Sequence, residues 1–61
     1  MTLITTKNLP DPDMAYAALL AAHKGLTETE SHALNARLVL ILMNHIGDPK
    51  TFQQALDLAR S

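Results

Sequence analysis

The 61-residue chain contains no cysteine, so neither a disulfide nor a thiolate metal site can stabilise its fold. A chain of this size hides only about 60% of the surface that its unfolded form exposes. Such small domains usually need a disulfide, a metal or a partner subunit in addition to their core. We therefore expect either a partner chain or unusually good packing between helices.

An excess of charge of one sign is also absent. Five Lys and Arg residues stand against six Asp and Glu residues, the net charge is -1, and the basic residues are scattered along the chain. This is a poor basis for binding nucleic acid, which depends on clustered Lys and Arg. The N-terminus lacks the pattern of a signal peptide, and the apolar run LVLILM is far shorter than the roughly 20 residues that cross a bilayer. We expect a cytoplasmic protein that binds neither nucleic acid nor membrane.

Aromatic residues are scarce, because Tyr16 and Phe52 are the only two, yet 48% of the chain is apolar. A core of Leu, Ala, Ile, Val and Met is typical of packed helices, so we predict an all-α fold. Residues 1–10 are rich in Thr and β-branched side chains, show no helical period and end at a proline, which predicts an extended N-terminal arm. Residues 11–61 are expected to form a single three-helix domain.

The first helix is predicted at about residues 12–24, because Asp11 before Pro12 has the pattern of an N-cap and Gly25 supplies a stop. Its larger side chains, those of Tyr16, Leu19, Leu20 and His23, share one face. The opposite side is almost entirely alanine. Alanine is the best helix former, so this stripe can reflect helix propensity alone, or it can let another helix approach closely.

The second helix is predicted at 28–46, from the capping-box spacing of Thr27 and Glu30 to a stop at Gly47. At 100° per residue, the side chains of LVLILM (38–43) point in every direction and leave none for water. One narrow polar stripe remains, because Glu30, Arg37 and Asn44 recur every seven residues.

The third helix is predicted at 49–60, where Asp48 before Pro49 repeats the start signal and one side carries Phe52, Ala55, Leu56 and Ala59. The connections between helices are so short that consecutive helices should turn back on each other. Two thin outer helices cannot surround the central one. We therefore expect a helical homodimer in which a second chain covers the sector centred on Asn35 and Leu42.

The predicted interface follows the second helix. Its members are Leu34, Asn35, Leu38, Ile41, Leu42, His45 and Ile46, with Arg37 and Asn44 at its rim. Asn35 lies among apolar residues, and a buried amide without partners costs about 1 to 3 kcal/mol. It can bond to a backbone carbonyl of its own chain, pair with its counterpart across the interface and fix the register, or recognise a ligand.

No catalytic residue, metal site or cofactor is expected. His23, His32 and His45 form no H-x-x-x-H pair, so helix capping or packing explains them better than metal binding. Ser31 and Ser61 lack a glycine-rich elbow, and no loop resembles a phosphate-binding loop.

A helix-turn-helix DNA-binding protein is a less favoured alternative. Its reading helix would be the third, which offers the polar side chains of Lys50, Thr51, Gln53, Gln54 and Arg60. The near-neutral charge and the tight joint before Pro49 argue against it.

The block LNARLVLILMNHIGD, with DPDMAYAALLAAHKGLTETES before it and ALDLAR after it, resembles a family of short bacterial proteins known as a domain of unknown function. The resemblance covers about residues 8–60 and is most specific in LNARL and NHIGD; Met43 stands where a smaller residue is expected. Members of that family are often encoded beside FAD-dependent aromatic hydroxylases or other oxidoreductases. The resemblance thus implies an accessory subunit of such an enzyme as the alternative to a non-enzymatic protein that self-associates, and it carries no catalytic residues.

Overall fold

The computed structural model describes residues 1–61 and is all-α, as predicted. Its helices are α1 (Pro12–His23), α2 (Glu28–Ile46) and α3 (Pro49–Arg60), and there is no strand. The first helix ends one residue before the predicted position, and residues 1–10 form neither helix nor strand. None of the three helices combines the length and the hydropathy that a membrane span requires.

Local hydrogen bonds fix where the helices begin and end. The Asp11 carboxylate accepts the Met14 N–H at 3.0 Å at the start of α1. At the start of α2, the Thr27 hydroxyl accepts the Glu30 N–H at 3.2 Å, and the Glu30 carboxylate accepts the Thr27 N–H at 2.9 Å. Gly47 ends α2 in the left-handed region, with φ of 67°, which is open to glycine at little cost. The expected capping box and glycine stop are therefore present.

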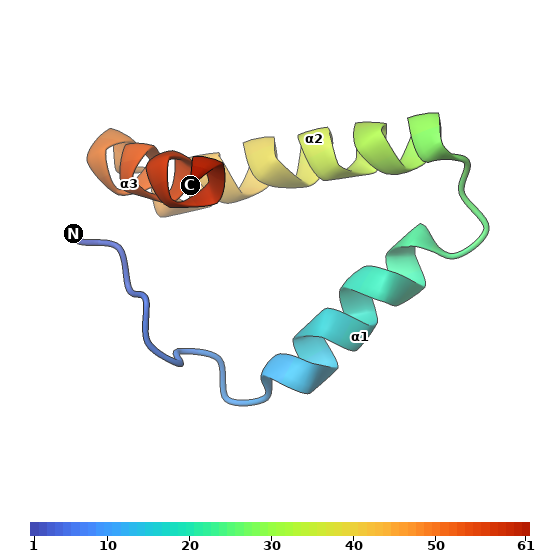
Figure 1. Ribbon diagram of the computed structural model, residues 1–61, viewed down its shortest axis with the longest axis horizontal. Helices are drawn as coiled ribbons and strands as arrows, with labels where there is room; N and C mark the ends of the chain where they lie inside the picture. The colour runs from blue at the N-terminus through green and yellow to red at the C-terminus, as the bar shows by residue number, and fades with distance from the viewer.

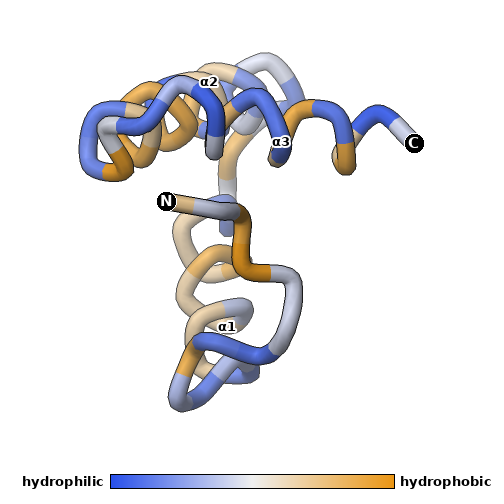
Figure 2. The backbone as a smooth tube through the Cα atoms, turned by 90° about the vertical axis from the view of Figure 1, so that its left-hand side faces the viewer, coloured by the Kyte–Doolittle hydropathy of each residue, from blue (hydrophilic) through white to orange (hydrophobic).

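The helices form an open frame around α2 (Figure 1). α3 lies across the C-terminal end of α2, whereas α1 ends near the N-terminal end of α2, so that α1 and α2 form a V whose apex is the 24–27 connection. Seen at a right angle, α1 points away from the layer that α2 and α3 form (Figure 2). The expectation that consecutive helices turn back on each other is therefore not met, because α1 diverges from α2 and α3 lies across the end of α2.

The N-terminal arm runs back to α3 and contacts its first two turns. The Leu3 N–H donates to the Gln54 side-chain oxygen at 3.0 Å, and the Thr51 hydroxyl lies 3.0 Å from the Met1 carbonyl oxygen. Thr51 is only 6% exposed and is the one buried residue of the chain. The arm is thus attached to α3 by polar contacts with residues about fifty positions away in sequence.

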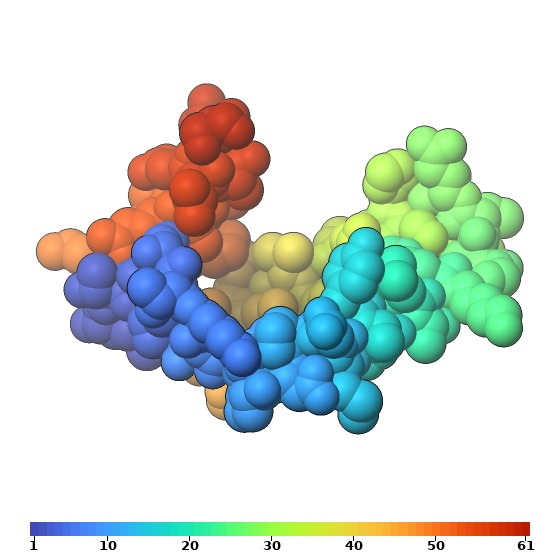
Figure 3. Space-filling model, turned by 60° about the horizontal axis from the view of Figure 1, so that its bottom comes forward, coloured from blue at the N-terminus to red at the C-terminus, as the bar shows by residue number.

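No apolar residue is buried, so this single chain has no hydrophobic core of its own. It exposes 5407 Å², whereas a folded monomer of 6.7 kDa is expected to expose about 3,900 Å². The chain hides only about 44% of the surface of its unfolded form, well below the roughly 60% usual for this size. The space-filling view shows the result, a hollow between α1, α2 and α3 (Figure 3). An excess of about 1,500 Å² remains in contact with water.

Loss of the capping box should destabilise the protein measurably. Thr27→Ala leaves the Glu30 N–H without its hydroxyl acceptor, and substitutions of this kind at an N-cap cost about 1 kcal/mol. We expect a lower urea midpoint in circular dichroism at fixed protein concentration. Thr5→Ala in the exposed arm is the matched control and should leave the midpoint unchanged. Equal midpoints for the two variants would show that the box contributes nothing.

Candidate interaction surface

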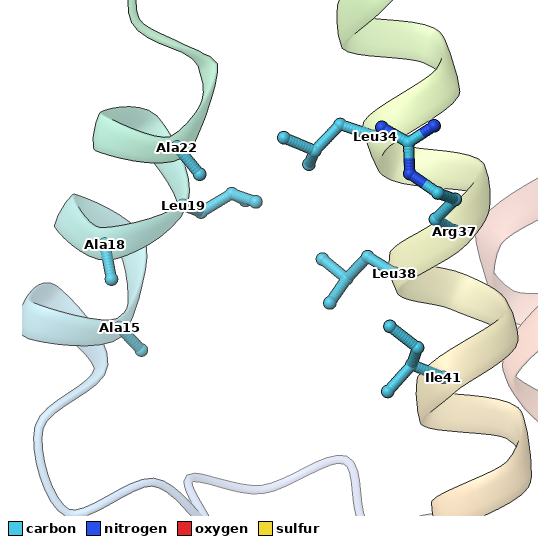
Figure 4. Close-up of a pocket in the computed structure, with 8 residues that line it drawn as sticks. All are labelled: Ala15, Ala18, Leu19, Ala22, Leu34, Arg37, Leu38 and Ile41. Carbon is cyan, nitrogen blue, oxygen red and sulfur yellow. The ribbon is translucent and has the colours of Figure 1, made fainter.

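A groove of about 550 Å³ runs between the diverging helices α1 and α2 (Figure 4). Seven of its eight lining residues are apolar. The contributions from the two helices are equal in number: Ala15, Ala18, Leu19 and Ala22 from α1, and Leu34, Arg37, Leu38 and Ile41 from α2. The groove is therefore an apolar surface built from two helices, with one cationic side chain in it.

The α1 wall of the groove is the alanine stripe. Its four residues follow the i, i+3, i+4, i+7 spacing of one helical face. Of the four larger side chains of α1, Leu19 lines the groove and His23 contacts Asn35, whereas Tyr16 and Leu20 are exposed outside the groove. The rotation of α1 about its axis is set at its last turn, where His23 contacts α2.

The α2 wall contains four of the nine residues predicted for the interface and its rim. Leu34 and Leu38 are partly buried and point toward α1, and Arg37 lies beside them. Ile41 is 65% exposed although it faces the groove. The two helices therefore line this groove without filling it.

Asn35 and His23 join α1 to α2 near the apex of the V. The His23 Nε2 and the Asn35 side-chain oxygen are 3.0 Å apart, a hydrogen bond in which the ring N–H donates. Asn35 thus pairs with a histidine side chain of its own chain and not with a backbone carbonyl. Its amide NH₂ group makes no hydrogen bond within the chain.

The remaining predicted interface residues lie outside the groove. Leu42, Ile46 and His45 are exposed, and Asn44 lines a second hollow of about 340 Å³ beside α3. The most exposed apolar side chains of α2 are Ile41 and its neighbour Leu40, at 65% and 63%, compared with 48% for Leu42. Leu40 did not appear in the predicted interface because it falls beside the polar stripe of Glu30, Arg37 and Asn44.

Several polar side chains of α3 are engaged within the chain. Thr51 is buried under the arm, Gln54 accepts the Leu3 N–H, and Gln53 donates to the Asp57 carboxylate at 2.9 Å. Of the five side chains considered for reading DNA, Lys50 and Arg60 have no side-chain hydrogen bond or ion pair.

The histidines are spread over the molecule. The His32 ring lies 3.6 Å from the Glu28 carboxylate one turn earlier in α2, and His23 contacts Asn35. No three side chains of the metal-binding types come together as a group.

Two carboxylates have lowered pKa values, and both accept hydrogen bonds at the start of a helix: Asp48 is the N-cap of α3, and Glu30 is part of the capping box of α2. The Thr51 hydroxyl, at 2.5 Å, is the main cause of the lowered pKa of Asp48, with smaller contributions from backbone N–H donors and the N-terminal amino group. For Glu30, the main cause of the lowered pKa is the Thr27 backbone N–H. Each carboxylate is stabilised in its charged form by the helix start that it caps.

The chain belongs to the family described as "Protein of unknown function (DUF2783)", which matches residues 3–61 and hence nearly its whole length. The expected resemblance to a domain of unknown function in a short protein is confirmed. No curated protein and no solved structure matches the sequence. The family description states no activity.

The Asp48 cap should make stability depend on pH at the acid end. Because its pKa is lowered by folding, the carboxylate stabilises the folded state above its unfolded pKa of about 3.9, and this stability is lost as the pH falls through the folded pKa. Asp48→Ala should therefore lower the urea midpoint at pH 7, and the deficit should shrink below about pH 3.9.

Asp57→Ala, which removes an exposed carboxylate of the same helix, is the control and should change the midpoint little at any pH. A deficit of Asp48→Ala that stays constant from neutral to strongly acid pH would show that the charge of Asp48 does not contribute.

Proposed function

We propose that this protein is a non-enzymatic interaction protein that self-associates through α2, with a homodimer as the favoured assembly. The observation that carries the proposal is the absence of any buried apolar residue in a chain that folds into three well-capped helices. Capping hydrogen bonds contribute about 1 kcal/mol each, which does not offset the entropy lost when some fifty residues become ordered. The missing stabilisation has to come from apolar surface that this chain presents and cannot cover.

The amount of surface supports an assembly of permanent character. Standard protein interfaces hide about 800 Å² per partner, and obligate homodimers hide more. The excess of about 1,500 Å² exposed by this chain falls in the obligate range. Each 100 Å² of apolar surface removed from water contributes about 2.5 kcal/mol, so burial of even a third of this excess would be comparable to the whole net stability of a small domain, about 5 to 15 kcal/mol.

The arrangement of polar groups fits an interface with an apolar centre. Leu38 and Ile41 lie at the middle of α2, whereas Arg37 and Asn44 lie along its polar stripe, where interface rims often place such residues. The free NH₂ group of Asn35 has two N–H donors that can bond to acceptors of a second chain. Such a bond would fix the register of two α2 helices, as single asparagines do in coiled coils.

The first test is the mass of the protein in solution. We expect sedimentation equilibrium to give a multiple of 6.7 kDa, with the dimer favoured, and the melting temperature to rise with protein concentration because association stabilises the folded state. A folded monomer at all concentrations would contradict self-association. If such a monomer instead co-purified with a flavin-dependent hydroxylase or another oxidoreductase and changed its turnover, the protein would be an accessory subunit.

The second test places a charge on the exposed face of α2. Ile41 is 65% exposed in the single chain, so a monomer should tolerate Ile41→Asp, whereas an interface that desolvates this position should not. We expect Ile41→Asp to shift the protein to monomer and to lower its melting temperature, and Ile41→Val to retain the assembly.

Ile4→Asp is the exposure-matched control, since Ile4 is 59% exposed in the arm, and it should leave the mass unchanged. Leu38→Asp, at a partly buried position, should produce a largely unfolded monomer. Retention of the full mass by Ile41→Asp would exclude α2 as the contact surface.

A further inference from the structure

We propose that the groove between α1 and α2 binds α2 of a second copy of this chain. Two V-shaped α1–α2 units would then interlock, and their four helices would form one common core. This inference rests on the proposed self-association and adds which surface receives which helix. In this arrangement the alanine wall of α1, which has no partner within its own chain, contacts the second copy.

The extent of the exposed surface favours a protein helix over a small ligand. A volume of about 550 Å³ lies within the range of small-molecule sites. However, the exposed apolar surface continues past the groove onto Leu40 and Val39, which do not line it. A small molecule in the groove would leave most of the excess of about 1,500 Å² in water, whereas a helix covers both parts.

Among the three helices, α2 is the one suited to occupy the groove of a second copy. Its central six residues are apolar in every direction, so one face can line its own groove while another enters the partner's. The one-sided α3 already turns Phe52 and Ala55 inward, where both are partly buried. The occupant must also present exposed apolar side chains, and Ile41 and Leu40 are the most exposed ones on α2.

A two-fold axis would bury both Ile41 and Leu40 in each copy, because each contact in a symmetric dimer is made twice. Ile41 lines the groove and would face α2 of the second copy. Leu40, 100° further round the helix, would then face the alanine wall of that copy's α1. Small side chains on this wall allow helix axes to approach to about 8 to 10 Å.

Arg37 adds a charge to the edge of this groove. It is the one polar residue of the eight that line the groove, and no carboxylate of its own chain lies within ion-pair distance. In the interlocked pair its long apolar stem can cover the entering helix while the guanidinium stays at the rim, open to water or to a carboxylate of the second copy.

The absence of cysteine makes a thiol-protection experiment clean, because one introduced cysteine is the only thiol in the chain. Ala18→Cys places it on the groove wall, and Ala17→Cys places it one position earlier, 100° round the same helix and outside the groove. A second pair of variants tests which helix enters the groove. Leu40→Cys places the thiol on α2 and Leu58→Cys places it on α3, at leucines that are exposed to a similar extent in the single chain. Alkylation rates are measured at protein concentrations far below and far above the dissociation constant found by sedimentation.

At high concentration we expect alkylation of Ala18→Cys and Leu40→Cys to slow by about tenfold, as the monomer fraction falls by mass action. Ala17→Cys and Leu58→Cys should be alkylated at the same rate at low and at high protein concentration.

If the protein dimerises by mass but Ala18→Cys is not protected, the groove is not the binding site, although self-association stands. Protection of Leu58→Cys in place of Leu40→Cys would overturn α2 as the occupant. A chain that stays monomeric would overturn both proposals, and circular dichroism checks that each variant keeps its helices.

Discussion

The structure depends on one geometric constraint: six consecutive apolar residues on a helix point in every direction, and this chain has only two other helices to cover them. α3 lies beside the Met43 end of α2, and α1 approaches the Leu38 side. Leu40 and Ile41 remain exposed between these contacts. A helix that is apolar all round is stable in water only when other groups surround it, and within this single chain α2 is surrounded only in part.

Polar contacts, and not a core, hold the open frame in place. His23 and Asn35 join α1 to α2 at the apex, and Thr51 with Gln54 joins the arm to α3 at the other end. A typical intramolecular hydrogen bond contributes a net stabilisation of about 1 kcal/mol. These contacts can therefore select the angle between the helices, while the free energy that keeps them folded must come from apolar burial elsewhere. Because polar contacts set the angle between α1 and α2 and no side chains fill the space between them, the groove stays open.

The sequence predicted the helices well because their signals are local. Asp11, Thr27 with Glu30, and Gly47 each act on backbone groups within four residues, so short patterns identify them. The docking of the arm on Gln54, 51 residues away from Leu3, has no such signal. Leu34, Leu38 and Ile41 could be found from the apolar pattern of α2, and Arg37 from the seven-residue repeat of its polar stripe. The alanine wall could not, because helix propensity explains an alanine stripe as well as packing does, and only the rotation of α1 decides between them.

If folding and association are coupled, the concentration of the protein determines what fraction of it is folded. A chain whose core is completed by a second copy has a folded population that rises with its concentration, since the assembly binds the folded form alone. The net charge of -1 supplies little repulsion between copies, so the approach of two chains is opposed mainly by lost entropy. In the proposed assembly, the capping box at the start of α2 and the His23–Asn35 contact would hold the two walls of the groove at a set angle, which limits the number of arrangements open to the entering helix. Under this proposal, the open V that leaves the single chain without a core is also the feature that specifies which helix completes it.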